Sequence, residues 1–285
     1  MLKRIIFLLG LLACCTPCLS SAYGQESSGR EEEKTAILLV HFGTTYDDAR
    51  SGTLDAFNDK VREAFPGIRV EEAYTSRVVM ARLKKRGIVK RNPREALLRL
   101  AADGVTHVVI QGTNILDGIE SEALREEARQ MAPFFDEIRV GRPLLYSVED
   151  CERVVSVMAD LYRKHADGDA AVVFVGHGTS VPANAVYSQI DYMFAAGGMP
   201  NFHVATVEGY PTCETVLAKL KAGSVRKVTL VPFLFVAGDH ARNDIDGEWR
   251  TRLEKAGFSV GTIREGLGQI PGIQCLYMDH IEVNL

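Results

Sequence analysis

One sequence signature occurs twice in this chain and points to a duplicated fold. Residues 39–44 read Leu-Val-His-Phe-Gly-Thr, and residues 174–179 read Phe-Val-Gly-His-Gly-Thr. Each signature closes a short apolar run, which is typical of a buried parallel strand. Residues 116–118 and 236–238 form a second, looser pair, each closing a later strand. We therefore predict an internal duplication with a boundary near Ser147, and a single large doubly wound sheet is the alternative.

Short apolar strands and amphipathic helices alternate from residue 35 onward. The sequence predicts strands at 36–40, 68–74, 107–110, 137–145, 171–175, 204–207, 228–235 and 259–264. It predicts helices at 47–65, up to 82, 93–102, 121–131, 148–165, 183–194, 214–221, 246–255 and 273–283. Such alternation indicates βαβ units and parallel sheets. The predicted fold is α/β, with two similar Rossmann-like lobes at 35–146 and 147–285, each a parallel sheet flanked by helices.

The N-terminus has the layout of a secretory signal peptide. Lys3 and Arg4 precede an uncharged apolar run at 5–13, which is too short to span a bilayer. Small residues follow, so we predict a signal peptide at 1–24, a flexible tether at 25–34, and a periplasmic mature chain without a transmembrane anchor. A membrane anchor and a lipid-modified Cys14 are the alternatives.

Composition narrows the function only by exclusion. The chain is 46% hydrophobic and 25% charged, with a net charge of −4, which is ordinary for a globular protein and gives no indication of a nucleic-acid partner. Three cysteines, Cys151, Cys213 and Cys275, lie in the predicted mature chain. An odd number of widely spaced cysteines implies no disulfide framework, although one bridge is permitted.

Three candidate metal ligands follow successive strands of the second half. His177 lies between two glycines after the first strand, Glu208 follows the next, and His240 follows the third. Because parallel strands end at one edge of a sheet, the three side chains are expected at a common rim. Two imidazoles and a carboxylate suit cobalt, nickel, iron or zinc better than magnesium or calcium. Taken singly, each residue also has a structural interpretation, such as a packing histidine or a helix-start glutamate.

These motifs resemble a known enzyme family. Gly-His-Gly-Thr at 176–179, Val-Glu-Gly at 207–209, Gly-Asp-His-Ala-Arg-Asn-Asp at 238–244 and His-Phe-Gly-Thr at 41–44 are similar to those of the anaerobic sirohydrochlorin cobaltochelatases of the class II chelatase group. The resemblance runs from about residue 35 to the C-terminus. It implies two chelatase-like lobes around a tetrapyrrole cleft, and a lyase that inserts metal for cobalamin biosynthesis.

The resemblance also assigns roles to residues. It implies that His177, Glu208 and His240 bind the metal and that His177 accepts a proton. The implied metal substrate is cobalt, with iron or nickel as alternatives, and the implied partner is a tetrapyrrole. We expect ring contacts from Thr44, Thr45, Tyr46, Gly178 and Thr179, and a homo-oligomer because small α/β chelatases associate.

A basic stretch in the first half fits a polyanionic ring. It comprises Arg82, Lys84, Lys85, Arg86, Lys90, Arg91 and Arg94. Such a run either captures carboxylates electrostatically or forms a solvated face. Three rival functions remain open on the sequence alone: an exported carrier of haem or another tetrapyrrole, a two-lobed periplasmic solute- or metal-binding protein, and a ferrochelatase.

Overall fold

Two four-stranded parallel sheets with the same strand order form the framework of the protein. The computed structural model describes residues 34–285, and its sheets have the orders β2-β1-β3-β4 and β6-β5-β7-β8. The first sheet consists of β1 (Thr35–His41), β2 (Arg69–Tyr74), β3 (His107–Gly112) and β4 (Glu137–Val140). The second consists of β5 (Ala170–Gly176), β6 (Phe202–Thr206), β7 (Lys227–Pro232) and β8 (Ser259–Thr262). The predicted duplication is confirmed, and the single-sheet alternative is wrong.

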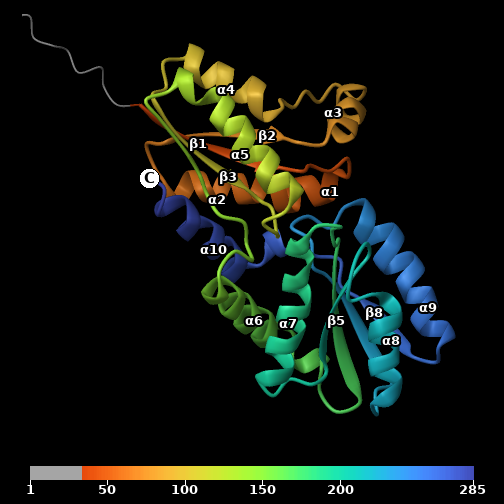
Figure 1. Cartoon of the computed structure of the whole chain (residues 1–285). Coiled ribbons are helices and arrows are strands. Elements are labelled where there is room, and N and C mark those ends of the chain that lie inside the picture. The colour runs from red at the N-terminus through yellow and green to blue at the C-terminus, as the bar shows by residue number, and fades with distance from the viewer. Residues whose placement is uncertain (1–33) are drawn as a thin grey trace, which may run out of the picture. The chain divides into compact units, whose positions relative to one another are not determined.

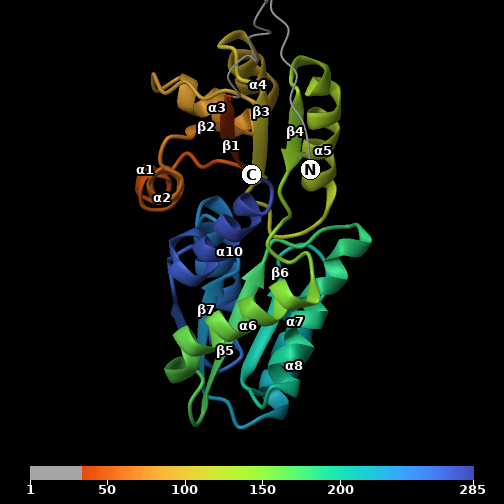
Figure 2. The same ribbon diagram turned by 90° about the vertical axis from the view of Figure 1, so that its left-hand side faces the viewer.

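Helices connect the strands and cover both sheets (Figures 1 and 2). The α-helices of the first half are α1 (Asp47–Ala49), α2 (Ala56–Ala64), α3 (Arg77–Lys84), α4 (Pro93–Ala102) and α5 (Ile119–Met131). Those of the second half are α6 (Val148–Tyr162), α7 (Ala185–Ala196), α8 (Cys213–Ala222), α9 (Arg250–Lys255) and α10 (Pro271–Glu282). Short 3-10 turns lie at Ala132–Phe134, Arg163–His165, Pro182–Asn184 and Leu267–Gln269.

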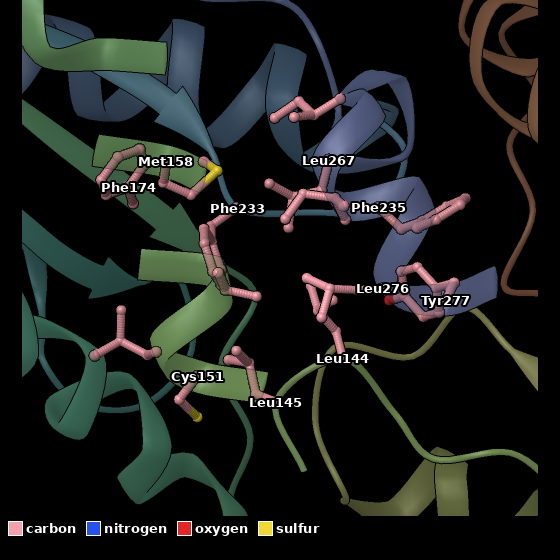
Figure 3. Packing of buried hydrophobic residues seen from close by; sticks show 14 of the residues in the cluster. Leu144, Leu145, Cys151, Met158, Phe174, Phe233, Phe235, Leu267, Leu276 and Tyr277 are labelled. Carbon is pink, nitrogen blue, oxygen red and sulfur yellow. The ribbon is translucent and has the colours of Figure 1, made fainter. Parts of the chain in front are cut away.

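Alternate residues of the central strands pack into different apolar cores. In β1, Ile37 and Leu39 belong to one buried cluster and Leu38 to another, as the period of two in a strand requires. In β5, Phe174 joins the same cluster as Ile37, whereas Val173 faces a separate one. One apolar core is therefore shared by the two sheets. Figure 3 shows its central part, where side chains from 144–145, α6 and α10 meet Phe233 and Phe235.

The helix α10 follows both sheets in sequence but packs back onto the first lobe. Figure 1 shows α10 beside α2, and the rings of Phe57 and Tyr277 lie 5.9 Å apart between them. The Tyr277 hydroxyl donates a hydrogen bond of 3.0 Å to the carbonyl oxygen of Asn114, directly after β3. Lys60 donates one of 2.6 Å to Gln274. The predicted division at 146/147 therefore separates the sheets in sequence, whereas the packing crosses it.

Two predicted helices contain π-helical segments. The helix expected at 47–65 consists of α1, a π-helix η1 (Arg50–Asp55) and α2. The helix expected at 246–255 begins earlier, as the π-helix η5 (Ala241–Trp249), and continues as α9. Wider turns of this kind are rare and often lie at functional sites. Hydrophobic periodicity does not distinguish them from α-helix.

The predicted signal peptide, tether, absence of a membrane anchor and state of the cysteines do not depend on the two sheets. The signal peptide and nearly all of the tether lie outside the described residues. Within residues 34–285 there is no helix long and apolar enough to cross a membrane. The thiols of Cys151, Cys213 and Cys275 are all free, and burial raises the pKa of Cys151 and of Cys213 to about 11.

A buried ion pair fixes the connection between the halves. His280 of α10 lies between Asp150 Oδ1, 3.0 Å from its Nε2, and the carbonyl oxygen of Arg142, 3.1 Å from its Nδ1. Both partner atoms only accept hydrogen bonds, so the imidazolium form satisfies them both. Asp150 also closes a capping box with Ser147 at the start of α6. Burial alone would raise the pKa of Asp150, but the bonds from His280 and Ser147 outweigh it and hold that pKa below its ordinary value of 3.8.

We predict that Asp150→Asn lowers the free energy of unfolding by about 3 kcal/mol at neutral pH, because it leaves His280 without its buried carboxylate. A depressed carboxyl pKa contributes stability above the unfolded-state value and loses it as pH falls through the folded-state value. The difference in the free energy of unfolding between wild type and variant should therefore disappear below about pH 4. Urea unfolding at several pH values measures this difference, and a difference that does not change with pH would contradict this account.

Candidate active site

A large cavity lies at the carboxyl ends of the strands of both sheets. Its volume is about 890 Å³, which falls in the range of pockets for cofactor-sized ligands. All predicted site residues line it: His177, Glu208, His240, Thr44, Thr45, Tyr46, Gly178 and Thr179. The cavity is also lined by Phe42, Val78, Arg82, Ile119, Glu120 and Asp239. This is the position at which ligands bind in open α/β sheets.

The loops that carry His177 and Glu208 are held together by their backbones. The Glu208 N–H donates a hydrogen bond of 2.7 Å to the carbonyl oxygen of His177, which continues the pairing of β5 with β6 beyond the strand ends. Gly178 has φ +85°, and a Cβ there would overlap the carbonyl oxygen of Glu208. Only glycine allows this approach, which explains why Gly178 follows His177.

His177 and His240 lie side by side. Their rings are 4.6 Å apart, centre to centre, at an interplanar angle of 80°. The Nδ1 of His177 lies 2.9 Å from the carbonyl oxygen of Gly178, and that of His240 lies 2.6 Å from Asp244 Oδ2. Because a carbonyl and a carboxylate accept hydrogen bonds, both histidines carry their proton on Nδ1 in the neutral form. Each therefore has a free lone pair on Nε2, the atom available to a metal ion.

Glu208 shares the cavity, but its side chain is exposed. Within the described residues, no three His, Cys, Asp or Glu side chains converge closely enough to enclose an ion. The structure thus brings the two predicted imidazole ligands together and places the predicted carboxylate on the same wall without joining it to them.

Tyr46, one of the predicted ring-contact residues, contacts the second lobe at the rim of the cavity. The Tyr46 hydroxyl donates a hydrogen bond of 3.0 Å to Asp239, which raises the pKa of Tyr46. The Arg242 guanidinium lies 4.1 Å above the Tyr46 ring and forms a 2.6 Å ion pair with Asp48. These contacts join the loop after β1 to the loop after β7.

The basic stretch is partly neutralised by neighbouring carboxylates. Arg86 pairs with Asp47, Lys90 with Glu72, and Arg94 with Glu127. Arg82, at the end of α3, is the only lysine or arginine that lines the cavity in the described part of the chain. One member of the stretch therefore lines the cavity, whereas three form ion pairs with carboxylates of the first lobe.

Two functional candidates were missed by the sequence analysis. Glu120 lines the cavity and accepts a 3.2 Å hydrogen bond from Asn114. Protein atoms around its carboxyl group raise its pKa above 4.5, although His177 and Asn114 oppose the shift. Asp244 orients His240. Extending the repeat of 116–118 and 236–238 by two residues would have aligned Glu120 with His240, and the four-residue spacing of His240 and Asp244 on a helix was a second signal.

His41, the last residue of β1, also lines the cavity. It is nevertheless buried, with Nε2 2.9 Å from Asn58 Oδ1 and Nδ1 3.1 Å from Thr113 Oγ1. Burial lowers the pKa of His41, and the hydrogen bond that His41 donates to Asn58 opposes that effect only in part. The ring is thus held as a neutral, hydrogen-bonded part of the cavity floor.

Comparison with known proteins identifies the family. Residues 35–285 match the family model described as cobalt chelatase (CbiK). This chain belongs to the cobalt chelatase (CbiK) family. It is 34% identical over 253 residues to a sirohydrochlorin cobaltochelatase of Salmonella typhimurium, which covers 87% of this chain and 95% of that protein. It is 33% identical over 259 residues to sirohydrochlorin cobaltochelatase CbiKC of Nitratidesulfovibrio vulgaris, with 87% and 89% covered.

Solved structures bear out the fold of this family member. SirB from Bacillus subtilis with Fe3+ superposes with a TM-score of 0.65 at 17% identity, covering 88% of this chain and 95% of that chain. A complex of the sirohydrochlorin chelatase SirB with cobalt, from Bacillus subtilis subspecies spizizenii, gives 0.64 at the same identity and coverage. The two-lobed chelatase-like α/β fold predicted from the sequence is confirmed.

We predict that Asp244→Asn weakens Co2+ binding roughly 10- to 100-fold, because the amide no longer fixes the tautomer and orientation of His240. Calorimetric titration of ring-free protein with Co2+ measures this effect. Asp246→Asn is a matched control in the same π-helix, since Asp246 pairs with Arg250 and Arg264 instead. Equal affinities in wild type and Asp244→Asn would contradict the orienting role.

Proposed function

We propose that this chain is a sirohydrochlorin cobaltochelatase. It inserts Co2+ into sirohydrochlorin, and two pyrrole N–H protons leave as the metal enters. One observation carries the proposal: His177 and His240 present two free Nε2 atoms on one wall of a cavity large enough for the ring. Family membership and the two cobaltochelatase relatives support the same reaction.

The two histidines and Glu208 have different roles in metal insertion. The two imidazoles replace water ligands of the incoming ion, and two neutral nitrogen ligands hold an intermediate-hardness cation without trapping it. Glu208, exposed on the same wall, supplies a third ligand when its side chain turns inward. After the metal has moved to the ring, a freed imidazole accepts a pyrrole proton on its Nε2 lone pair.

We predict that mature protein accelerates the visible-band shift of sirohydrochlorin with Co2+ over a protein-free control, and that His177→Ala and His240→Ala each abolish the acceleration. Both side chains line an open cavity, so both variants should fold and give the wild-type circular dichroism spectrum. Full activity in either purified variant would exclude the assignment. No acceleration by wild type, with ring or metal still bound, would instead favour a tetrapyrrole or metal carrier.

Glu120 is proposed as a second proton acceptor. Its carboxylate lies in the same cavity and interacts electrostatically with His177. A raised pKa makes a carboxylate a stronger base while leaving it ionised above that pKa. It therefore accepts a proton released from the ring more readily than an ordinary glutamate does.

We predict that Glu120→Gln lowers kcat by about 10²- to 10⁴-fold, the usual contribution of a positioned base. In wild type, kcat should rise with pH through the Glu120 pKa, which lies above the ordinary 4.5. This acid limb should vanish in the variant, which has no carboxyl group to titrate. A variant kcat within threefold of wild type, with the rise of kcat with pH retained, would show that another group accepts the proton.

The finer features are also proposals. The layout of residues 1–24 supports export to the periplasm, and N-terminal sequencing of the mature chain would locate the cleavage site or refute processing. Iron and nickel are alternative substrates, since two imidazoles suit them as well. An absorbance band in the protein as purified would reveal bound haem, and sedimentation would test the expected homo-oligomer.

A further inference from the structure

The charge of the cavity lining suits a metal ion better than an anionic ring. Three carboxyl groups line the cavity, from Glu120, Glu208 and Asp239, whereas Arg82 is the one lysine or arginine among the described residues around it. Negative groups attract Co2+ and repel anions. The ring of the proposed reaction is a polycarboxylate, so electrostatic attraction for it has to come from charges outside the lining.

A run of positive charge lies in the first lobe. Residues 73–94 contain eight lysines and arginines and no aspartate or glutamate, although the whole chain has a net charge of −4. Three of the eight, Arg86, Lys90 and Arg94, are paired with carboxylates. The other five form no ion pair with any described residue, and all five are exposed. We call them the basic patch, which consists of Arg77, Arg82, Lys84, Lys85 and Arg91.

The fold makes the basic patch compact and places it beside the cavity. The helix α3, orange in Figure 1, follows the edge strand β2 and carries most of the patch. The Tyr74 N–H at the end of β2 donates a hydrogen bond of 2.8 Å to the carbonyl oxygen of Arg91, which holds Arg91 near the start of α3. Val78, Val79 and Arg82 of α3 line the cavity. The basic patch therefore adjoins the mouth of the cavity.

Helix stability explains only part of this charge. Lys84 and Lys85 lie at the C-terminal end of α3, where the helix dipole favours cations. Arg77 is the first residue of the helix, where the same dipole disfavours a cation. Five unpaired cations in one small region also repel one another. An approaching anion offsets that repulsion, so the patch fits the capture of an anionic ligand better than a solvated face.

We propose that the basic patch attracts the polycarboxylate ring from solution and guides it to the mouth of the cavity. This inference rests on the proposed function and adds how the substrate is selected. Exposed charges interact over roughly 8–10 Å at moderate salt, so the patch acts before the ring touches the lining. Such steering raises association rates by about 10- to 1,000-fold and depends on ligand charge. The patch therefore favours highly carboxylated rings, while the cavity keeps the negative lining that suits the metal.

The test measures how fast metal-free sirohydrochlorin binds to mature protein. Stopped-flow fluorescence gives the association and dissociation rate constants at ionic strengths of about 0.01 M and about 1 M, where the screening length is roughly 30 Å and 3 Å. The wild-type association rate constant should fall by roughly tenfold or more between the two. The double variant Lys84→Gln/Lys85→Gln should lower it about fivefold at low salt and leave the dissociation rate constant within about twofold, because charges outside the contact surface act on association.

A matched control removes the same charge at a distance from the cavity. Lys164 and Lys221 are exposed and form no ion pair with any described residue. They precede β5 and β7, so they lie toward the end of the second sheet opposite the cavity. The double variant Lys164→Gln/Lys221→Gln should keep the association rate constant within about twofold of wild type at low salt. A porphyrin with two carboxylates should lose less of its association rate with salt than sirohydrochlorin does.

The outcomes separate the basic patch from the proposed reaction. Equal association rates in wild type and Lys84→Gln/Lys85→Gln at low salt would overturn the proposal. An equal loss of rate in the control variant would also overturn it, because net charge alone would then explain the effect. Wild type that binds the ring in a salt-dependent way but never inserts Co2+ refutes the chelatase function and leaves the patch assignment standing. Active wild type whose association rate is independent of salt refutes the patch assignment alone.

Discussion

The backbone hydrogen bonds that continue strand pairing past the end of each central strand determine the cavity. In the second lobe they join Glu208 to His177, and in the first they join Ser76 to Phe42. Because main-chain atoms make these bonds, the bonds themselves do not depend on which side chains His177, Glu208, Phe42 and Ser76 carry. Gly178 is the steric condition for the second-lobe bond. With the backbone fixed, the side chains that enter the cavity decide its chemistry.

Much of this architecture follows from local sequence, and the remainder from packing over long range. The helix at 93–102 was predicted with its observed bounds because Asn92 and Pro93 mark its start. His177 and His240 were expected at this edge because His177 directly follows β5 and His240 lies in the segment that follows β7. Glu120 was missed because its raised pKa depends on protein atoms brought together only by folding. The position of α10 against the first lobe also has no local signal, since an amphipathic helix does not specify its partner.

The two halves of the cavity differ chemically although their backbones correspond. Phe42 and His177 hold equivalent positions, as do Glu120 and His240. The shared core between the sheets, with the Asp150–His280 pair at its edge, holds the two surfaces in register.

The return of α10 to the first lobe has a consequence for how the protein is made. During synthesis the first sheet emerges well before α10, so the first lobe lacks Tyr277 and Gln274 against α2 and the end of β3 while the second sheet is being translated. A duplicated protein might be expected to fold half by half, in the order of translation. Here the first half stays unfinished until the second is complete. The first lobe can therefore complete its packing only after the last helix of the chain has been translated.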